Sequence, residues 1–293
     1  MRITMTGATG FIGSRVRARL EAAGREVRAV SRRERAGFHA WAGPEAPFPE
    51  GALEGSDAVI HLAGETVAQR WTEAVKRRIR ESRVEGTKRL VEALEKAGKR
   101  PGVLICASAT GYYGNRGEEV LDETSGPGEG FLAETCVEWE RAAARAAELG
   151  LRVVHLRFGM VLGREGGALA KMLPAFRLCL GGKLGTGQQW MPWIHIEDAV
   201  EMMVWALQEP GLSGACNAVA PAPVRNADFT RALEGILGRP AMWTVPEWAL
   251  RAALGEGAEI ALASQRVMPR VAANAGFRFR HPHVADALRS LLS

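Results

Sequence analysis

Three glycines near the amino terminus have the spacing that binds the phosphates of a dinucleotide. Gly7, Gly10 and Gly13 stand between an apolar–polar alternation at residues 2–6 and a helical pattern that extends to Gly24. In such a turn the first glycine permits the bend, the second lets the backbone approach a pyrophosphate, and the third lets helix and strand pack closely. The free N–H groups and the dipole at the helix start favour the anion. The spacing predicts a dinucleotide site, with a ligand-free strand-to-helix turn as the alternative.

The end of the second expected strand bears on which dinucleotide is bound. A site for NAD usually places a carboxylate there, on the 2′-hydroxyl of the adenosine ribose. This chain instead has Ser31, Arg32 and Arg33. Because a guanidinium suits a 2′-phosphate, NADP is favoured over NAD, and a solvent-exposed arginine pair is the alternative interpretation.

Strands and helices alternate along much of the chain in a way that would position these residues. Strands are expected at residues 2–6, 26–31, 57–64, 103–107, 151–158, 193–196 and 215–220. The helices between them include a long one along the stripe from Trp71 to Leu94 and another at 131–149, which indicates βαβ units, a parallel sheet and helices on both faces. The expected fold class is α/β, with a doubly wound parallel sheet.

The alternation is interrupted by a glycine-rich segment at 159–192, and the tail is mainly helical, broken by Pro240, Pro246 and Pro269. Long excursions of this kind often bind substrate. We therefore expect residues 1–158 with 193–221 to form the NADP-binding domain, and residues 159–192 with 222–293 to form the substrate-binding region. Asp198 is expected to cap a helix at 199–208.

Composition and charge are those of an ordinary globular protein. Its 293 residues are 47% hydrophobic and 24% charged, enough to bury a core. The net charge is +5, and most basic clusters are interleaved with glutamates, so nucleic-acid binding is not expected. The sequence has neither an apolar run of about 18 residues nor the apolar core of a signal peptide, so no membrane span or export is expected. Four widely spaced cysteines favour a reduced, cytoplasmic protein.

Five segments, in order, resemble landmarks of the extended short-chain dehydrogenases/reductases. They are residues 6–13, His61-Leu62-Ala63-Gly64, Gly86-Thr87, residues 156–163 (Leu-Arg-Phe-Gly-Met-Val-Leu-Gly) and residues 193–199 (Trp-Ile-His-Ile-Glu-Asp-Ala). Together they cover about residues 1–240. The runs at 108–114, 171–177, 192–195, 265–269 and 275–277 are similar to an atypical branch of that family, described as epimerase family proteins or nucleoside-diphosphate-sugar epimerases.

The resemblance implies a Rossmann-type doubly wound parallel sheet with a smaller, mainly helical C-terminal substrate region. It also implies NADP in a cleft at the ends of the strands and a set of residues that contact it. Carried over residue by residue, the contacts fall into four groups. The phosphates belong to Gly7, Gly10, Phe11, Ile12 and Gly13, the adenosine ribose to Ser31 and Arg32, and the middle of the cofactor to Leu62 and Ala63, with Arg83 on the long helix as a further candidate.

The proton-transfer machinery of that family is only partly present. Its members usually have a Ser or Thr after the fourth strand and a Tyr-x-x-x-Lys on the next helix, where the lysine helps the tyrosine exchange a proton. Ser108 matches the first part. At the position that resembles that of the family's tyrosine, however, this sequence has Phe131, and it has no lysine between Lys99 and Lys171.

The only two tyrosines stand just after the fourth strand, at Tyr112 and Tyr113. Either one could replace the missing tyrosine if a cation, such as Arg116 or the oxidised nicotinamide, lies beside it. Ser108, Tyr112 and Tyr113 are therefore the predicted catalytic residues. Packing of a tyrosine in the core and a backbone cap formed by the serine are the alternatives.

Substrate contacts are predicted in the segments that resemble the family's substrate-binding part. They are Lys171, Gln189 and Trp193, with burial as the alternative for the tryptophan. No metal site is predicted, because His61, His155 and the other strand histidine, His195, have no Cys or acidic partner at metal spacing.

The sequence thus favours an NADP-dependent oxidoreductase or epimerase-like enzyme that transfers hydride to or from a small polar or nucleotide-linked substrate. The alternative is a catalytically degenerate NADP-binding regulatory protein on the same fold, because fold does not determine function. A homodimer formed by packing of two long helices is common in the family. The sequence names neither the substrate nor the direction of the reaction.

Overall fold

The computed structural model describes residues 1–293, the side chain of residue 50 excepted, and a parallel sheet of seven strands forms its centre. The strands lie in the order β12-β7-β5-β4-β1-β2-β3. They are β1 Arg2–Thr6, β2 Glu26–Ser31, β3 Phe38–Ala40, β4 Ala58–His61, β5 Val103–Ala109, β7 Arg152–Phe158 and β12 Gly214–Ala218. The chain first runs outward from β1 through β2 to β3 and then returns to β4 on the other side. The strand order therefore reverses between β1 and β4, where open α/β sheets bind their ligands.

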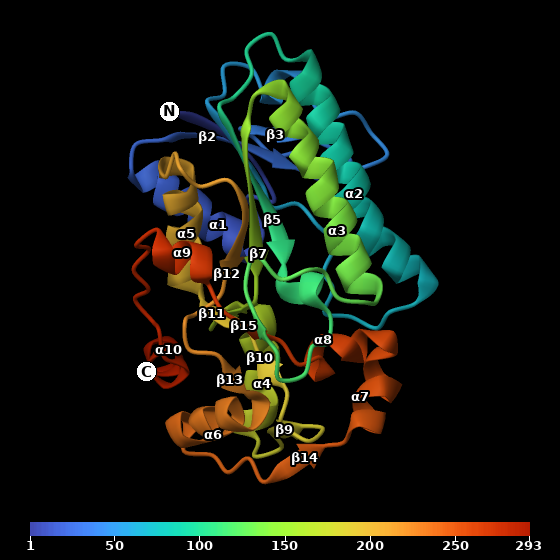
Figure 1. The fold of residues 1–293 in the computed structure, drawn as a ribbon, viewed down its shortest axis with the longest axis vertical. Helices are drawn as coiled ribbons and strands as arrows, with labels where there is room; N and C mark the ends of the chain where they lie inside the picture. Colours follow the sequence, from blue (N-terminus) through green and yellow to red (C-terminus); the bar gives the residue numbers. More distant parts are fainter.

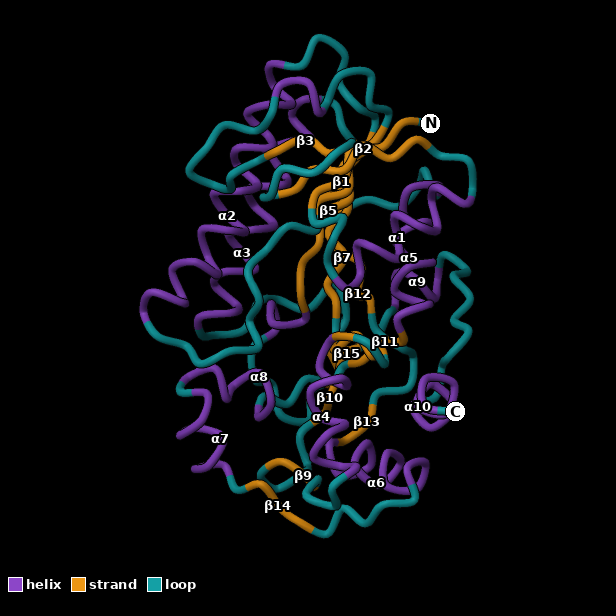
Figure 2. The backbone as a smooth tube through the Cα atoms, turned by 180° about the vertical axis from the view of Figure 1, so that it is seen from behind, coloured by secondary structure: helices purple, strands orange, loops and turns teal.

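Helices cover both faces of this sheet, as the two backbone views show (Figures 1 and 2). On one face α1 (Phe11–Ala22) and α5 (Ile196–Gln208) bury apolar side chains against β1, β4 and β5. On the other face α2 (Glu73–Lys96) and α3 (Phe131–Ala144) do the same. Both faces of the strands are apolar because both are covered. This is the Rossmann-type doubly wound fold expected from the sequence.

Most of the remaining elements gather beyond the carboxyl ends of β5 and β7, whereas α9 packs beside α5 and β12 (Figure 1). The helices are α4 Gly167–Arg177, α6 Asn226–Leu237, α7 Glu247–Leu254, α8 Glu259–Leu262, α9 Arg270–Asn274 and α10 Val284–Leu292. Short strands pair as β8 Met160–Gly163 with β11 Trp193–His195, β9 Gly182–Leu184 with β14 Trp243–Val245, β10 Trp190–Met191 with β13 Val224–Arg225, and β6 Val120–Leu121 with β15 Arg266–Val267. Single 3-10 turns are η1 Glu50–Ala52, η2 Thr110–Tyr113, η3 Arg145–Leu149 and η4 Glu256–Ala258.

Two helices differ in detail from the expectation. The helix expected at 131–149 is α-helical only to Ala144 and continues as η3, after which Gly150 turns the chain with a left-handed backbone at φ 88°. The stretch after residue 159 contains α4, in spite of Pro174 inside it. Within the described part of the chain, none of the helices has both the length and the apolar character needed to cross a membrane.

The start of α5 corrects the prediction for Asp198. The helix begins at Ile196, and the imidazole of His195 caps it, its Nδ1 accepting the Glu197 backbone N–H at 3.1 Å. Asp198 lies inside the first turn, where its two carboxylate oxygens accept the backbone N–H groups of Arg280 and His281 at 2.8 and 3.0 Å. Asp198 therefore does not cap the helix but attaches the C-terminal segment to the Rossmann part of the molecule.

Replacing Asp198 by asparagine tests this attachment. The amide places an NH2 group opposite one of the two backbone N–H groups, so we expect the free energy of unfolding to fall by about 1–3 kcal/mol. Urea unfolding measures the difference. As a matched control, Asp286→Asn removes an exposed carboxylate that pairs with Arg289 and should change stability by less than about 0.5 kcal/mol. Equal losses in the two variants would contradict the assignment.

Candidate functional site

The glycine turn, residues 7–13, lies at the point where the strand order reverses, and its glycines are required by close contacts. Gly7 has φ +67°, and a β-carbon there would lie 2.7 Å from the carbonyl carbon of Leu62. A β-carbon on Gly13 would lie 2.1 Å from the carbonyl oxygen of Gly7. On Gly10 its nearest neighbour would be that same oxygen, at 3.3 Å. The turn is therefore packed against β4 through its first glycine and against itself through its last.

The start of α1 has the features of an anion site. Gly10 is the N-cap residue, and the described residues supply neither a side-chain cap nor an acidic group in the first turn. The first N–H groups of the helix are thus available to a ligand. The ring of Phe11 packs on the turn at Gly163 and Gly166, where added β-carbons would come within 2.4 and 2.3 Å of it. Phe11 and the partly buried Ile12 therefore have only their backbone to offer a phosphate.

The ends of β2 and β4 flank the turn. The backbone N–H groups of Leu62 and Ala63 both donate to Thr6 Oγ1 at 3.2 Å, which fixes the exit of β4 against Gly7. At the end of β2, Ser31 Oγ accepts the Arg33 backbone N–H at 3.3 Å. Arg32 projects outward, its side chain 77% exposed and 3.8 Å from a carboxylate oxygen of Glu65. These residues lie where the two halves of a dinucleotide would leave the helix start.

Arg83 reaches the same edge from α2. Its guanidinium donates to the carbonyl oxygens of Glu65 and Ile79 at 3.0 and 3.2 Å and stacks over the ring of Trp139 at 5.2 Å. A β-carbon on Gly64 would lie 3.3 Å from its guanidinium carbon. Burial holds the pKa of Arg83 below its usual range. The side chain thus brings a positive charge next to the loop that follows β4.

An ion pair joins β7 to α3 at the carboxyl end of the sheet. Arg157 forms a bidentate pair with Glu140, both N–O distances being 2.8 Å, and the Ser108 hydroxyl donates to the same carboxylate at 2.6 Å. Although burial opposes the charged form, the hydrogen bonds with Glu140 hold the pKa of Arg157 above its usual range. Ser108 is 3% exposed, and its hydroxyl hydrogen is committed to Glu140. Sequence reasoning missed Glu140 because the charges around it are typical of a solvated helix face.

The two tyrosines have different surroundings. Tyr113 is 0% exposed; its hydroxyl accepts from Arg157 at 3.0 Å and lies 2.8 Å from Asn217 Oδ1, and burial raises its pKa to about 12. Its prediction as a catalytic residue is wrong, because it is part of the core. Tyr112 is half-buried and has the guanidinium carbon of Arg157 3.5 Å from the centre of its ring. The cation beside it is therefore Arg157, whereas Arg116 pairs with Glu119.

The side of α3 that faces these tyrosines carries neither a tyrosine nor a lysine. Phe131, the position that resembled the family's tyrosine, packs against Trp71 with ring centres 5.2 Å apart. Leu132 and Cys136 face η2 instead: a β-carbon on Gly111 would lie 3.2 Å from Leu132 Cβ and 3.9 Å from Cys136 Sγ. Burial raises the pKa of Cys136 to about 11. An ordinary Tyr–Lys pair is absent from this face of the described helix.

The predicted substrate contacts lie in three different environments. Lys171 on α4 is exposed, and its ammonium donates to the carbonyl oxygen of Ala68 at 2.8 Å, which connects α4 to the loop after β4. Gln189 is buried, its amide donating to the carbonyls of Leu184 and Ala261 at 3.1 Å. Trp193 is 1% exposed and belongs to the core of the substrate region. For Gln189 and Trp193 the prediction is wrong, because burial keeps both side chains from a substrate.

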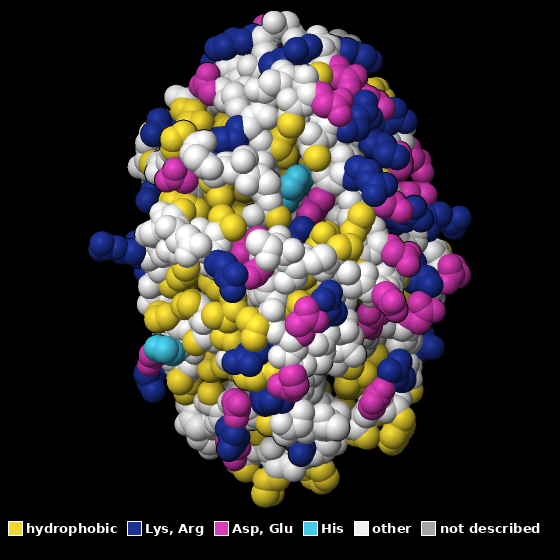
Figure 3. Space-filling model, viewed as in Figure 1, with side chains coloured by type: hydrophobic (Ala, Val, Ile, Leu, Met, Phe, Trp, Pro, Cys, Tyr) yellow, Lys and Arg dark blue, Asp and Glu magenta, His cyan; other side chains and the backbone are white. Residues whose placement is uncertain are grey.

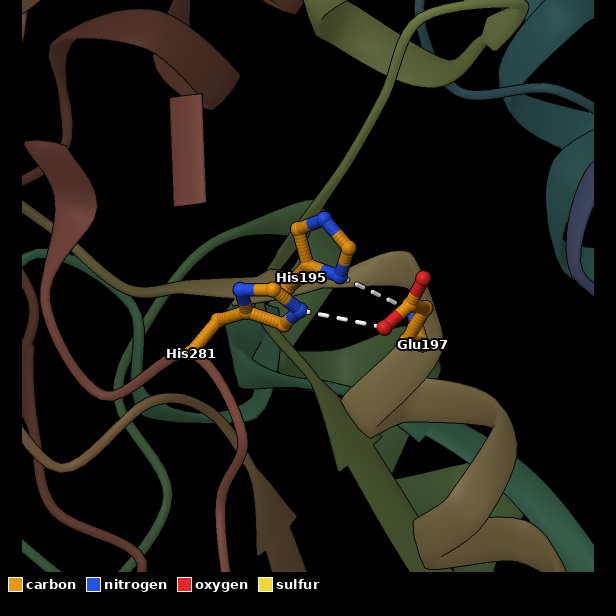
Figure 4. Close-up of side chains that lie close together, drawn as sticks. All are labelled: His195, Glu197 and His281. Carbon is orange, nitrogen blue, oxygen red and sulfur yellow. Dashed lines mark hydrogen bonds and ion pairs between the residues drawn. The ribbon is translucent and has the colours of Figure 1, made fainter. Parts of the chain in front are cut away.

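A cluster that the sequence did not indicate brings His195, Glu197 and His281 together (Figure 4). The two imidazoles stack with centres 3.7 Å apart and an angle of 31° between their planes, and Glu197 lies 3.1 Å from His281 Nε2. A bound metal would have to lie in the plane of each imidazole, which stacked rings do not allow without moving. The positive end of α5 also disfavours a cation here. We interpret the cluster as a further attachment of the C-terminal segment.

The outer surface of α2 and α3 carries basic and acidic side chains side by side (Figure 3). Ion pairs on these helices include Arg80 with Glu138, Lys88 with Glu85 and Arg89 with Glu92, and Arg145 at the start of η3 pairs with Glu95 on α2. Exposed pairs of this kind contribute little to stability. This is the solvated helix face that the interleaved charges predict.

The fold and the glycine turn together define a protein of the Rossmann class with a dinucleotide-type turn at its switch point. Comparison with known proteins narrows the class. Residues 3–217 match the model of the NAD dependent epimerase/dehydratase family, and residues 245–291 match a domain of unknown function, DUF1731. The chain belongs to the NAD dependent epimerase/dehydratase family.

Individual relatives place it in the atypical branch that the sequence resembled. It is 40% identical to the chloroplastic epimerase family protein SDR39U1 homolog of Arabidopsis thaliana, over 100% of this chain and 87% of the relative. The crystal structure of human epimerase family protein SDR39U1 with NADPH is similar with a TM-score of 0.92 and 35% identity, covering 100% and 99% of the two chains. A nucleoside-diphosphate sugar epimerase from Corynebacterium glutamicum has a TM-score of 0.82 and 37% identity, and this chain spans 58% of its length.

The variant Glu140→Gln tests the ion pair between β7 and α3. It leaves the buried Arg157 without a charged partner, so we expect a loss of about 3–5 kcal/mol in the free energy of unfolding. Thermal or urea unfolding measures it. Glu138→Gln, two residues away on the same helix, removes the exposed pair with Arg80 and should cost less than about 1 kcal/mol. If the two variants are equally stable, the buried pair does not have the importance given to it here.

Proposed function

We propose that this protein binds NADP(H) and transfers hydride between the nicotinamide and a small polar or nucleotide-linked substrate, as an NADP-dependent oxidoreductase or epimerase-like enzyme. The single observation that carries the proposal is the uncapped start of α1 behind a glycine turn at the switch point of the sheet. The human relative solved with NADPH supports the cofactor, and the name of the Corynebacterium relative supports a nucleotide-linked substrate.

The residues around the turn fit such a cofactor. In this proposal the backbone of residues 7–13 holds the pyrophosphate, Ser31 and Arg32 hold the adenosine ribose with its 2′-phosphate, and Leu62 and Ala63 line the middle. Arg83 adds positive charge beside Gly64. The bound nicotinamide supplies the hydride chemistry, and the protein supplies orientation and a route for the proton.

At the carboxyl end of β5, Tyr112 is the predicted catalytic residue whose side chain is not enclosed by the core. We propose that its phenol contacts the reacting part of the substrate, while Arg157 behind its ring provides positive charge. Ser108 then acts through Glu140 as a positioning residue, because its hydroxyl already donates to that carboxylate.

The two-part organisation expected from the sequence is part of the proposal. Residues 1–158 with 193–221 bind the cofactor, and residues 159–192 with 222–293 bind the substrate, with Lys171 at the junction. A homodimer stays a prediction, as does a cytoplasmic location, since the Arabidopsis relative is named chloroplastic.

A regulatory NADP-binding protein is the second candidate, and one observation favours it. Leu132 and Cys136 occupy the face of α3 turned toward η2, and neither is an effective proton donor at neutral pH. Leu132 has no ionisable group, and burial raises the pKa of Cys136 to about 11. In this case the cofactor would change the affinity for another molecule rather than react.

The variant Arg32→Ala tests the choice of cofactor. Loss of a charge-assisted contact to the 2′-phosphate should weaken NADPH binding by about 10- to 100-fold and leave NADH binding unchanged. Fluorescence titration of both cofactors measures this. Arg25→Ala, at the opposite end of β2, is the matched control and should alter neither affinity. Equal loss for NADPH and NADH in Arg32→Ala would contradict a 2′-phosphate site.

Hydride transfer is tested by loading the protein with NADPH deuterated on the transferable face and incubating it with a metabolite extract. We expect deuterium in a small molecule by mass spectrometry, and the labelled molecule gives the substrate class. The Arg32→Ala variant, assayed below saturation, should label the same molecule more slowly. Bound NADPH without label, together with an NADPH-dependent change in binding to a protein partner, would favour the regulatory candidate.

A further inference from the structure

The C-terminal region is fixed against the loop that follows β4. The Trp71 backbone N–H donates to the Leu254 carbonyl oxygen at 3.1 Å, and Lys76 at the start of α2 pairs with Glu256 at 2.9 Å. Arg70 donates to the Ala252 carbonyl oxygen as well. Residues 247–262, which comprise α7, η4 and α8, are thereby held below the start of α3 (Figure 1).

This segment brings a carboxyl group to the beginning of α3. The two carboxylate oxygens of Glu259 lie 3.1 and 3.7 Å from the position of a β-carbon on Gly130, the N-cap residue of α3. Gly130 has φ +98° and no side chain, so the carboxyl group occupies the space that a side chain would fill. The Glu259 side chain is half-buried. Burial, and then the like charge of Glu256, raise its pKa above the ordinary value for glutamate.

The beginning of α3 adjoins the reacting end of the proposed cofactor site. A dinucleotide held at the start of α1 would have its adenosine near Ser31 and Arg32 at the end of β2 and its middle near Leu62 and Ala63 at the end of β4, so its other end would lie toward β5. There the chain enters η2, where Gly111 packs on Leu132, two residues after Gly130. Glu259 therefore approaches from the substrate region the place where the nicotinamide and the substrate would meet.

Apart from Tyr112, to which the orienting role is given below, the other proton donors considered for this end have their protons committed or firmly held. The Ser108 hydroxyl donates to Glu140, the Tyr113 hydroxyl is enclosed in the core, and burial raises the pKa of Cys136 to about 11. A half-exposed carboxyl group whose pKa lies above the ordinary value has the properties that a general acid needs.

We propose that Glu259 is the acid–base group of this site, an inference that rests on the hydride transfer proposed above. In the reducing direction the substrate carbonyl carbon receives hydride from the nicotinamide, and its oxygen takes the proton of the Glu259 carboxyl group. The products are an alcohol, the oxidised cofactor and the Glu259 carboxylate, which regains a proton from water. The oxidising direction is the reverse. Tyr112 orients the substrate oxygen in both directions.

A binding experiment tests this without a known substrate. The dissociation constants of NADP+ and NADPH are measured by tryptophan fluorescence from pH 5 to 9, and their ratio is followed. Above its pKa Glu259 is a carboxylate, which favours the positively charged oxidised ring, so the ratio of the NADP+ constant to the NADPH constant should fall about three- to tenfold as pH rises. Titration of the 2′-phosphate is common to both cofactors and largely cancels in the ratio.

Three variants give the test its controls. In Glu259→Gln the ratio should not change with pH. Glu247→Gln, which removes an exposed carboxylate paired with Arg251 on α7, should behave like the native protein. Glu256→Gln removes the like charge beside Glu259, so the change in ratio should move to lower pH.

Each other outcome counts against the proposal. If Glu259→Gln keeps the pH dependence of the native protein, or if the native ratio is flat, Glu259 does not face the nicotinamide. A lower melting temperature with an unchanged ratio would show that Glu259 only stabilises the start of α3. If the native protein binds neither cofactor, the proposed function itself fails and this inference with it.

Discussion

The arrangement of the molecule depends on a backbone contact between Gly7 and the exit of β4. The hydroxyl of Thr6 accepts the N–H groups of Leu62 and Ala63 and lies 2.8 Å from Nδ1 of His61, so one side chain at the end of β1 fixes three consecutive residues after the reversal of strand order. Gly7 can approach this exit because it has no β-carbon. The opening between β1 and β4 therefore has a fixed width, and residues contributed by β2, α1 and α2 take their positions from it.

A second constraint acts at the carboxyl ends of β5 and β7. Burying Arg157 and Glu140 is costly unless their hydrogen bonds are nearly complete, and the structure satisfies them with Ser108, with Tyr113 and with each other. The same network sets the two tyrosines apart: one contributes its hydroxyl to the core, while the other lies with its ring against the guanidinium. Polar chemistry at this end of the sheet is thus largely structural, which is why the source of a proton has to be sought in the C-terminal segment.

The fold and the cofactor end of the site were predictable because their signals are local. The glycine turn spans seven residues, the alternation of apolar runs gives the parallel sheet, and Ser31 with Arg32 follows directly after a strand. The comparisons confirm the family and the fold class, and they leave the substrate open.

The other end of the site depends on contacts between residues far apart in the chain. Glu140 pairs with Arg157, Glu259 lies beside Gly130, and His195 stacks on His281. No spacing in the sequence predicts these contacts. Local patterns also gave a wrong prediction for a side chain whose role depends on its burial. Trp193 stands in a segment typical of substrate contacts, but its indole belongs to the core of the substrate region. Aspartate is a residue type that often caps helices, but here His195 caps α5. The carboxylate of Asp198 instead binds the C-terminal segment.

Two buried histidines, His61 and His195, make the stability of the protein depend on pH in mild acid. Burial lowers the pKa of His61 from 6.5 to about 4, and burial followed by the neighbouring His281 does the same for His195. Both rings are neutral in the folded protein, whereas the unfolded chain binds a proton at each as the pH falls below 6.5, so stability decreases between pH 6.5 and 4. Charging His61 would also place an N–H group on Nδ1 beside Thr6 Oγ1, which already accepts two backbone N–H groups, and charging His195 would remove the cap of α5. Mild acidification therefore weakens the nucleotide-binding turn and the attachment of the C-terminal segment together, through two imidazoles that have no direct part in the chemistry.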